Sequence, residues 1–190
     1  MRQYQSSPPR SFRYKRTVPT VVSQGDAALC WAAALESWLD VTVREFGEQS
    51  GTWEGDDARR KFFEGAPWSR EKLSLTEITK RWKDLTNADG SLKPENMPTL
   101  AIDIGMTGSI FLPPSLKEES VQEKLKTSGC LYIIYFSVQM NHAIVSYGFD
   151  TADGLLVMDP NPERGLITRK IDFFKEPGRV QKMMFVGWAI

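Results

Sequence analysis

Residues 24–39 read Gln-Gly-Asp-Ala-Ala-Leu-Cys-Trp-Ala-Ala-Ala-Leu-Glu-Ser-Trp-Leu. The alanines favour a helix, and the large apolar residues after them recur at helical spacing and would share one buried face: Leu35, Trp38 and Leu39. We therefore expect a helix that begins near residues 28–29. Cys30 would lie in its first turn, six residues after Gln24.

Cys30 would have the surroundings of a nucleophile at that position. The positive end of a helix dipole and a neighbouring imidazolium both favour a thiolate over a thiol. The unpaired N–H groups of a first helical turn also suit the oxyanion that forms when a thiolate attacks a carbonyl. On its own, a free cysteine is more often a small buried apolar residue. Gln24 favours the catalytic interpretation, because its side-chain amide can supply a second oxyanion donor.

His142 is the only histidine of the chain and therefore the only histidine that can serve as the base. It opens an apolar, strand-like run, and Asp159 closes the next such run. If the two runs form a hairpin around residues 150–153, His142 and Asp159 face each other with Cβ atoms roughly 5 Å apart. Such an aspartate would orient the imidazole and stabilise its charged form. A lone histidine in an apolar strand is more often structural, so the prediction of a Cys-His-Asp triad depends on this hairpin register.

The remaining chain divides into a helical part and a part made of strands. Capping boxes predict helices after Ser74-Leu-Thr-Glu77 and after Ser115-Leu-Lys-Glu118, the second ending at Gly129, and residues 56–63 predict a further short helix. Strand-like runs separated by turn residues then cover residues 131–137, 142–149, 154–158, 166–170 and 180–189. This segregation favours an α+β fold, in which an N-terminal helical part with the nucleophile at a helix start packs on a C-terminal antiparallel β-sheet.

Length and composition are those of one globular domain. The 190 residues include 24 Lys and Arg and 24 Asp and Glu, so no general attraction to nucleic acid is expected. No apolar run approaches the ~18 residues that a membrane span needs, and no cleavable signal peptide is visible. Residues 1–17 carry basic residues and no acid, which predicts a flexible basic arm ahead of a domain at 18–190.

The chain shows no pattern typical of a metal or cofactor site. One histidine and no Cys-x-x-Cys motif argue against a zinc site, and we expect no cofactor and no metal. The two cysteines, Cys30 and Cys130, are expected to be reduced. Cys130 precedes the most apolar strand-like run and is expected in the core.

Four short motifs follow one another in an order that resembles the papain-like cysteine proteases: Gln24, Cys30-Trp31, His142 and Asp159. The segments at residues 141–150 and 157–162 look most like the bacterial branch, which includes bacteriocin-leader peptidases and the effector proteases that pathogens inject into hosts. The chain lacks the Cys-Gly-Ser-Cys-Trp and Asn-Ser-Trp-Gly segments of lysosomal and plant enzymes, and it has Asp159 where they usually have asparagine. These differences argue against a lysosomal-type enzyme.

The resemblance implies a thiol protease that hydrolyses peptide bonds through an acyl-enzyme, with this catalytic set: Cys30 as nucleophile, His142 as base, Asp159 as its orienting group and Gln24 as oxyanion donor. Trp31 and Asn141 are candidates for contact with the substrate. The implied partner is a protein or peptide substrate, with a cognate inhibitor or immunity protein as a further candidate, and we expect a monomer. The expected location is the bacterial cytoplasm, or a host or rival cell after export without a cleavable signal peptide, as for an effector or toxin.

Two other functions fit the same residues. A thiol deamidase or acyltransferase that acts on protein glutamine would use the same triad, and the shape of the pocket would decide between the reactions. A catalytically silent papain-like domain used for binding is the second alternative. A domain kept only for binding has no chemical need for Cys30, His142, Asp159 and Gln24 together, which weighs against the silent form.

Overall fold

The computed structural model describes residues 13–25, 28–48, 73–104, 106–111, 115–136, 141–175 and 182–188. At its centre is one seven-stranded sheet, in which all the paired strands are antiparallel. Its strands are β1 (Arg13–Lys15), β2 (Met106–Phe111), β3 (Leu131–Phe136), β4 (Asn141–Asp150), β5 (Gly154–Asp159), β6 (Gly165–Arg169) and β7 (Lys182–Trp188). Their order is β2-β7-β3-β4-β5-β6, and β1 pairs with the last residues of β4.

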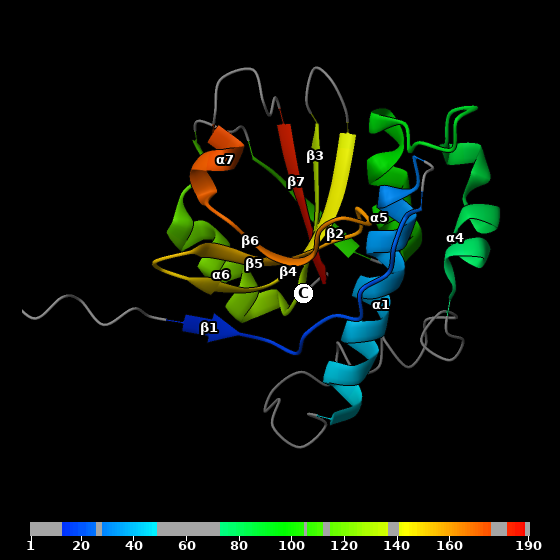
Figure 1. The fold of residues 1–190 in the computed structure, drawn as a ribbon. Coiled ribbons are helices and arrows are strands. Elements are labelled where there is room, and N and C mark those ends of the chain that lie inside the picture. Colours follow the sequence, from blue (N-terminus) through cyan, green and yellow to red (C-terminus); the bar gives the residue numbers. More distant parts are fainter. Residues whose placement is uncertain are drawn as a thin grey trace, which may run out of the picture.

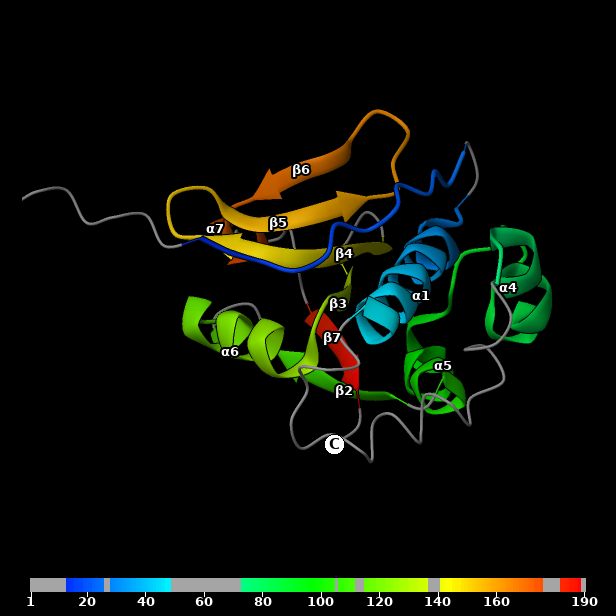
Figure 2. The ribbon, with the colours of Figure 1, turned by 90° about the horizontal axis from the view of Figure 1, so that it is seen from below.

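Helices cover both faces of this sheet (Figures 1 and 2). They are α1 (Cys30–Glu48), α4 (Leu75–Arg81), α5 (Met97–Ile104), α6 (Glu118–Ser128) and α7 (Ile171–Lys175), with 3-10 turns at Lys83–Leu85 and Pro94–Asn96. α1 lies against β3 and β4 and contacts α4 on its outer side, whereas α6 and α7 lie on the other face. Among the helices that the structure describes, none is long and apolar enough to cross a membrane.

This architecture confirms the predicted α+β fold, with Cys30 at the start of a helix that packs on an antiparallel sheet. The predicted strands correspond to β3–β7, and their ends differ by at most two residues from the prediction. Strands β1 and β2 are not predicted from the sequence. β1 lies in the segment predicted as a flexible arm, and β2 contains a glycine and a serine, which weaken the strand signal. Residues 1–12 of that arm and the helix predicted at residues 56–63 lie outside the described residues.

One predicted capping box is confirmed and the other is wrong. The Ser74 N–H donates to Glu77 Oε2 (2.8 Å), and the Glu77 N–H donates to Ser74 Oγ (3.4 Å) at the start of α4. By contrast, α6 begins only at Glu118: its N-cap residue is Lys117 in place of Ser115, with an extended backbone (φ −111°, ψ 145°) and no hydrogen bond from the Lys117 side chain to cap the helix. Leu116, two residues ahead of the helix, is buried.

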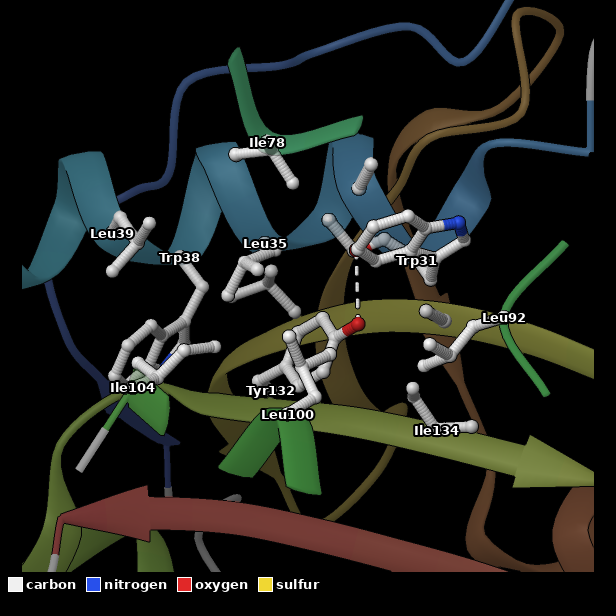
Figure 3. Close-up of a cluster of buried hydrophobic side chains, with 14 of the residues drawn as sticks. Trp31, Leu35, Trp38, Leu39, Ile78, Leu92, Leu100, Ile104, Tyr132 and Ile134 are labelled. Carbon is white, nitrogen blue, oxygen red and sulfur yellow. Dashed lines mark hydrogen bonds between the residues drawn. The ribbon is translucent and has the colours of Figure 1, made fainter. Parts of the chain in front are cut away.

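The first core fills the space between the helical layer and one face of the sheet, and its residues include Trp31, Leu35, Trp38, Tyr132 and Ile134 (Figure 3). The Tyr132 hydroxyl donates to the Trp31 carbonyl (2.9 Å), and the Trp38 indole N–H donates to the Cys130 carbonyl (2.8 Å). Buried aromatic side chains need such partners for their polar atoms. These two bonds fix the first turns of α1 on β3.

The second core lies on the opposite face, under α6 and α7. It includes Leu125 and Phe174 from the helices, and Ile144 and Val157 from β4 and β5. Side chains along a strand alternate between the two faces. His142, two residues before Ile144, and Asp159, two residues after Val157, therefore lie on this same face.

Residues 16–24, which we call the N-terminal strap, run from β1 along α1 (Figure 2). The Arg44 guanidinium donates to the Val18 carbonyl (3.0 Å), and the Thr20 hydroxyl donates to Asp40 Oδ2 (2.7 Å). The Ser37 hydroxyl, fully buried, donates to the Thr20 carbonyl (2.6 Å). Hydrogen bonds with side chains of α1 thus hold the strap against this helix. The strap ends at Gln24.

Candidate active site

Cys30 is the first residue of α1, and its side chain is partly exposed. The next residue, Trp31, holds this end of the helix, because its indole N–H donates to the Gly90 carbonyl (2.9 Å). The Cys30 Sγ lies 3.7 Å from the carbonyl oxygen of Asn141, the first residue of β4. The thiol therefore faces the strand that carries His142. In the first turn, the N–H groups of Ala32 and Ala33 donate to the Leu29 carbonyl (3.0 Å each), whereas the Cys30 N–H, which precedes them, has no acceptor within the helix.

His142 is buried in β4 with only 6% of its surface exposed. Its Nε2 lies 2.8 Å from Asp159 Oδ1, and its ring packs edge-on against Tyr135 at a centroid distance of 5.5 Å. Cys30 is the other group that acts on the pKa of this imidazole, and Nδ1 is the ring nitrogen that the bond with Asp159 leaves open. Burial works to lower the pKa of His142, but hydrogen bonds to Asp159 and Cys30, together with their charges, outweigh it and raise the pKa to about 9.

Asp159, at the end of β5, is fully buried and has four partners. Its Oδ1 accepts the Asn161 backbone N–H (3.0 Å) in addition to the bond with His142. Its Oδ2 accepts from Arg164 Nη1 (3.1 Å) and Arg169 Nη2 (3.4 Å). Burial alone would raise the pKa of Asp159, but the hydrogen bond and charge of His142, followed by Asn161 and Arg164, hold it well below its usual range.

The hydrogen bond between His142 and Asp159 forms in a register different from the predicted one. The β4–β5 turn pairs Asp150 with Gly154, and a bulge between Ser146 and Gly148 shifts the ladder, so that Val145 pairs with Met158. Continuing that register places Asp159 opposite residue 144 instead of His142. A two-residue offset keeps both side chains on the same face, and diagonal neighbours on that face remain within reach.

Gln24 lies beside the same end of β5. Its backbone N–H donates to the carbonyl of Pro160 (2.9 Å), the residue that follows Asp159. Gly25 comes next with a φ of 64°, a left-handed conformation that favours glycine, in the turn that leads to α1. The strap, α1, β4 and β5 thus bring Gln24, Cys30, His142 and Asp159 to one end of the sheet.

Trp31 and Asn141, predicted as substrate contacts, occupy different surroundings. Trp31 is 2% exposed and belongs to the first core, which leaves almost no surface for a substrate. Asn141 is half-buried and borders Cys30 through its backbone carbonyl. Of these two residues, Asn141 is the one with surface available next to the thiol.

Cys130 is buried, as its position before an apolar strand predicts. Its Sγ lies 3.7 Å from the Thr17 carbonyl oxygen and 3.8 Å from Glu45 Oε1. Burial, and then the charge of Glu45, raise the pKa of Cys130 well above its ordinary value. Such a thiol is a poor nucleophile near neutral pH.

Sequence reasoning missed Arg164 and Arg169, the two cationic partners of Asp159. Both follow Asp159 within ten residues, one in a turn and one at the end of β6. An arginine near a strand end is usually a solvated surface residue, so only the folded chain shows that both guanidiniums turn inward. Within the described part of the chain, no group of three or more His, Cys, Asp or Glu side chains is arranged to hold a metal ion.

A family model described as "Papain-like cysteine protease AvrRpt2" matches residues 65–177, a range that includes His142 and Asp159. No curated protein sequence matches the chain.

Two solved structures share the fold. The peptidase domain of Streptococcus ComA, a bi-functional ABC transporter involved in a quorum sensing pathway, is 14% identical with a TM-score of 0.52, covering 88% of this chain and 97% of that one. A double glycine motif protease from an AMS/PCAT transporter, in complex with the leader peptide, is 18% identical with a TM-score of 0.50, covering 91% and 94%. At these identities the likeness establishes the fold alone.

Proposed function

Since this chain belongs to the AvrRpt2 family of papain-like cysteine proteases, we propose that it cleaves peptide bonds with a triad of Cys30, His142 and Asp159. The observation that carries this assignment is the 2.8 Å hydrogen bond between His142 Nε2 and Asp159 Oδ1. It leaves the second ring nitrogen for Cys30, whose sulfur lies 3.7 Å from the carbonyl oxygen of Asn141, the residue before His142. A base held between a nucleophile and an orienting carboxylate is the arrangement that nucleophilic catalysis requires.

The reaction follows from these positions. The Cys30 sulfur attacks the carbonyl carbon of the scissile bond and forms a C–S bond, while the carbonyl electron pair moves to oxygen. The oxygen pair then returns, the C–N bond breaks, and the imidazolium of His142 gives its proton to the leaving amine. In the second half, His142 takes a proton from water, the hydroxide attacks the thioester, and Cys30 leaves with both electrons of the C–S bond. Acid and amine are the products, and the reaction needs no cofactor.

The oxyanion of each step needs donors that do not move. We assign this role to the backbone N–H of Cys30 and the side-chain amide of Gln24. The strap supports the assignment, since Gln24 is tied to the Pro160 carbonyl by its own N–H (2.9 Å) at the end of the strand that carries Asp159. Donors fixed before the reaction stabilise developing charge without the cost of reorganising.

We propose a protein or peptide as the substrate. The structural neighbour solved in complex with the leader peptide supports a peptide in this fold. On the resemblance seen in the sequence, we further propose that residues 18–190 act as an effector or toxin in a host or rival cell, with a cognate inhibitor or immunity protein in the producing cell.

The test compares the protein with its Cys30→Ala and Cys130→Ala variants on a proteome whose new N-termini are labelled. The active protein and Cys130→Ala should create the same set of new N-termini, whereas Cys30→Ala should create none. The matched cysteine control separates loss of the nucleophile from loss of a thiol. Equal cleavage by Cys30→Ala would refute the triad.

The same samples separate proteolysis from deamidation or acyl transfer. Hydrolysis of a peptide bond creates two chain ends, whereas deamidation changes a glutamine side chain by about one mass unit and leaves the chain intact. Glutamine changes without new N-termini would replace the protease assignment by the deamidase one.

A further inference from the structure

The carboxylate of Asp159 is held from two sides. On the Oδ1 side it accepts from His142 and the Asn161 N–H, and on the Oδ2 side it accepts from Arg164 (3.1 Å) and Arg169 (3.4 Å). Asp159 is fully buried, so its charge has no water to stabilise it and depends on these partners. A carboxylate with bonds on both oxygens cannot rotate about its C–C bond without breaking them.

We propose that Arg164 and Arg169 are positioning residues of the protease reaction: they keep Asp159 charged and turned so that Oδ1 faces His142. The inference rests on the proposed triad and goes beyond it, because neither arginine touches the reacting atoms. Both act through Asp159.

Arg169 is the more firmly held of the two. Its side chain is 20% exposed, and its guanidinium lies over the Phe173 ring at 4.7 Å. Phe173 packs edge-on against Tyr135 (6.1 Å), and Tyr135 packs edge-on against His142 (5.5 Å). One closed ring of contacts therefore runs from His142 through Asp159 to Arg169 and back through the two aromatic rings.

Arg164 is held by the turn that follows Asp159. Its backbone N–H donates to the Asn161 carbonyl (2.9 Å), so the turn that aims the Asn161 N–H at Asp159 also sets the position of Arg164. Its side chain is 42% exposed. With Arg169 it lines an open groove of about 630 Å³, whose other lining residues are Tyr147, Leu156, Leu166, Ile167 and Thr168. Because the Arg164 side chain is more exposed than that of Arg169, solvent screens its charge more, so Arg164 should contribute less.

The arginine charges have a second consequence, for the proton of His142. Among the residues that the structure describes, the ionisable groups that face this ring are Cys30 from α1, Tyr135 from β3 and Asp159 from β5, with the two guanidiniums behind Asp159. On α7, Lys175 Nζ lies 3.8 Å from Asp172 Oδ1, so these two residues pair with each other. Asp172 points to solvent, with 88% of its side chain exposed. A positive charge behind Asp159 opposes the imidazolium, so its removal should let His142 keep its proton to higher pH.

The test is the Arg169→Gln substitution, which keeps an N–H donor and removes the charge. Alkylation of Cys30 by iodoacetate and by iodoacetamide gives a readout that needs no substrate. A positively charged His142 attracts the anionic iodoacetate but not the neutral iodoacetamide, so iodoacetate is favoured only while His142 is protonated. The ratio of the two alkylation rates, measured against pH, therefore reports the protonation of His142. In Arg169→Gln the alkaline fall of this ratio should move to higher pH, and kcat/KM should drop roughly 10- to 100-fold with KM little changed. Arg164→Gln should shift the ratio in the same direction and lower kcat/KM only about two- to fivefold.

The decisive comparison is made in the Asp159→Asn background. An amide has no charge for the guanidinium to hold, so adding Arg169→Gln to Asp159→Asn should change kcat/KM by less than about twofold. Arg81→Gln is the matched control, because Arg81 also lies over an aromatic ring (Trp82, 5.4 Å) but on α4, and it should change nothing. An equal loss with and without Asp159, or an unmoved alkaline fall in both arginine variants, would overturn the inference.

Folding and the proposed triad are checked separately. If Arg169→Gln does not fold, as judged by its circular dichroism, the same comparison is made with the more exposed Arg164→Gln, and its outcomes carry the same meaning. If Cys30→Ala retains full activity, the triad itself is wrong. If Cys30→Ala is inactive while the arginine and Asp159 effects simply add, only the positioning role is lost.

Discussion

The ionisation of His142 is the property of the site that can be measured most directly, because the chain has no other histidine. In the folded protein the pKa of His142 is raised from 6.5 to about 9. At 1.36 kcal/mol per pH unit, this corresponds to about 3 kcal/mol in favour of the imidazolium. Burial of the ring acts in the opposite direction and is the largest single influence, so Asp159 and Cys30 together contribute more than this net value.

The perturbation is Asp159→Asn, which keeps the size of the side chain and removes its charge. An opposite charge at hydrogen-bond distance shifts a pKa by about 1–3 units, so we expect the pKa of His142 to fall by at least about one unit. Cys30→Ala should lower it as well, since the thiol is the second contact that raises it. With both changes, burial acts without either partner, and the pKa should fall below 6.5.

The assay is an NMR titration of the imidazole Cε1–H in protein without a histidine tag, from about pH 5 to pH 11. With one histidine, no assignment step is needed. A parent protein in which His142 titrates near 6.5, or a pKa of about 9 that neither substitution changes, would refute the account of the site.

The same shift predicts how stability depends on pH. The folded pKa of His142 lies above the unfolded one, so its contribution to stability is complete below about pH 6.5 and is lost as the pH rises towards about 9. Urea unfolding should therefore show stability falling between pH 6.5 and 9 in the parent protein, with a smaller fall in Asp159→Asn. An equal pH dependence in the two proteins would contradict the linkage.

Three further predictions concern the thiols, the oxyanion donor and the strap. Iodoacetamide at about pH 6 should modify Cys30 and spare Cys130, because burial and then the charge of Glu45 raise the pKa of Cys130. Mass spectrometry after digestion shows which cysteine is modified first, and equal labelling of the two would count against catalysis by Cys30. Gln24→Ala should lower kcat/KM roughly 100- to 1000-fold, while Cys30 is still alkylated at the rate of the parent protein. An unchanged kcat/KM would show that Gln24 does not stabilise the oxyanion. Ser37→Ala removes the buried hydrogen bond to the strap and should lower the free energy of unfolding by about 1 kcal/mol in urea titrations; unchanged stability would show that the strap does not depend on this bond.

Local patterns in the sequence were sufficient to predict the elements that carry the proposed catalytic residues. A helix that begins near residues 28–29, within two residues of its start at Cys30, follows from the alanine run and the spacing of Leu35 and Trp38, because helix propensity and amphipathic spacing are properties of consecutive residues. The strands that carry His142 and Asp159 follow from apolar runs bounded by turn residues. Side chains of a strand alternate between its two faces, so predicting that these two residues share a face required only the correct alternation. An error of two residues in the register does not change that alternation.

Other features depend on contacts between segments that are distant in the chain. Arg13–Lys15 becomes a strand because the end of β4 offers an unpaired edge, and its own short, basic sequence carries no such signal. The bulge between Ser146 and Gly148 set the actual register of β4 on β5. The bonds of Trp31 to Gly90 and Tyr132, which hold it in the core, likewise join segments that are far apart in the chain.

The support of Asp159 shows the same limit most clearly. Arg164 and Arg169 are five and ten residues beyond Asp159, and nothing in their neighbours distinguishes them from solvated surface arginines. Their partner becomes available only when β5 and β6 pair and α7 brings Phe173 under Arg169. A buried carboxylate attracts a cation only after the surrounding fold has removed water from it, so this interaction could emerge only from the folded chain.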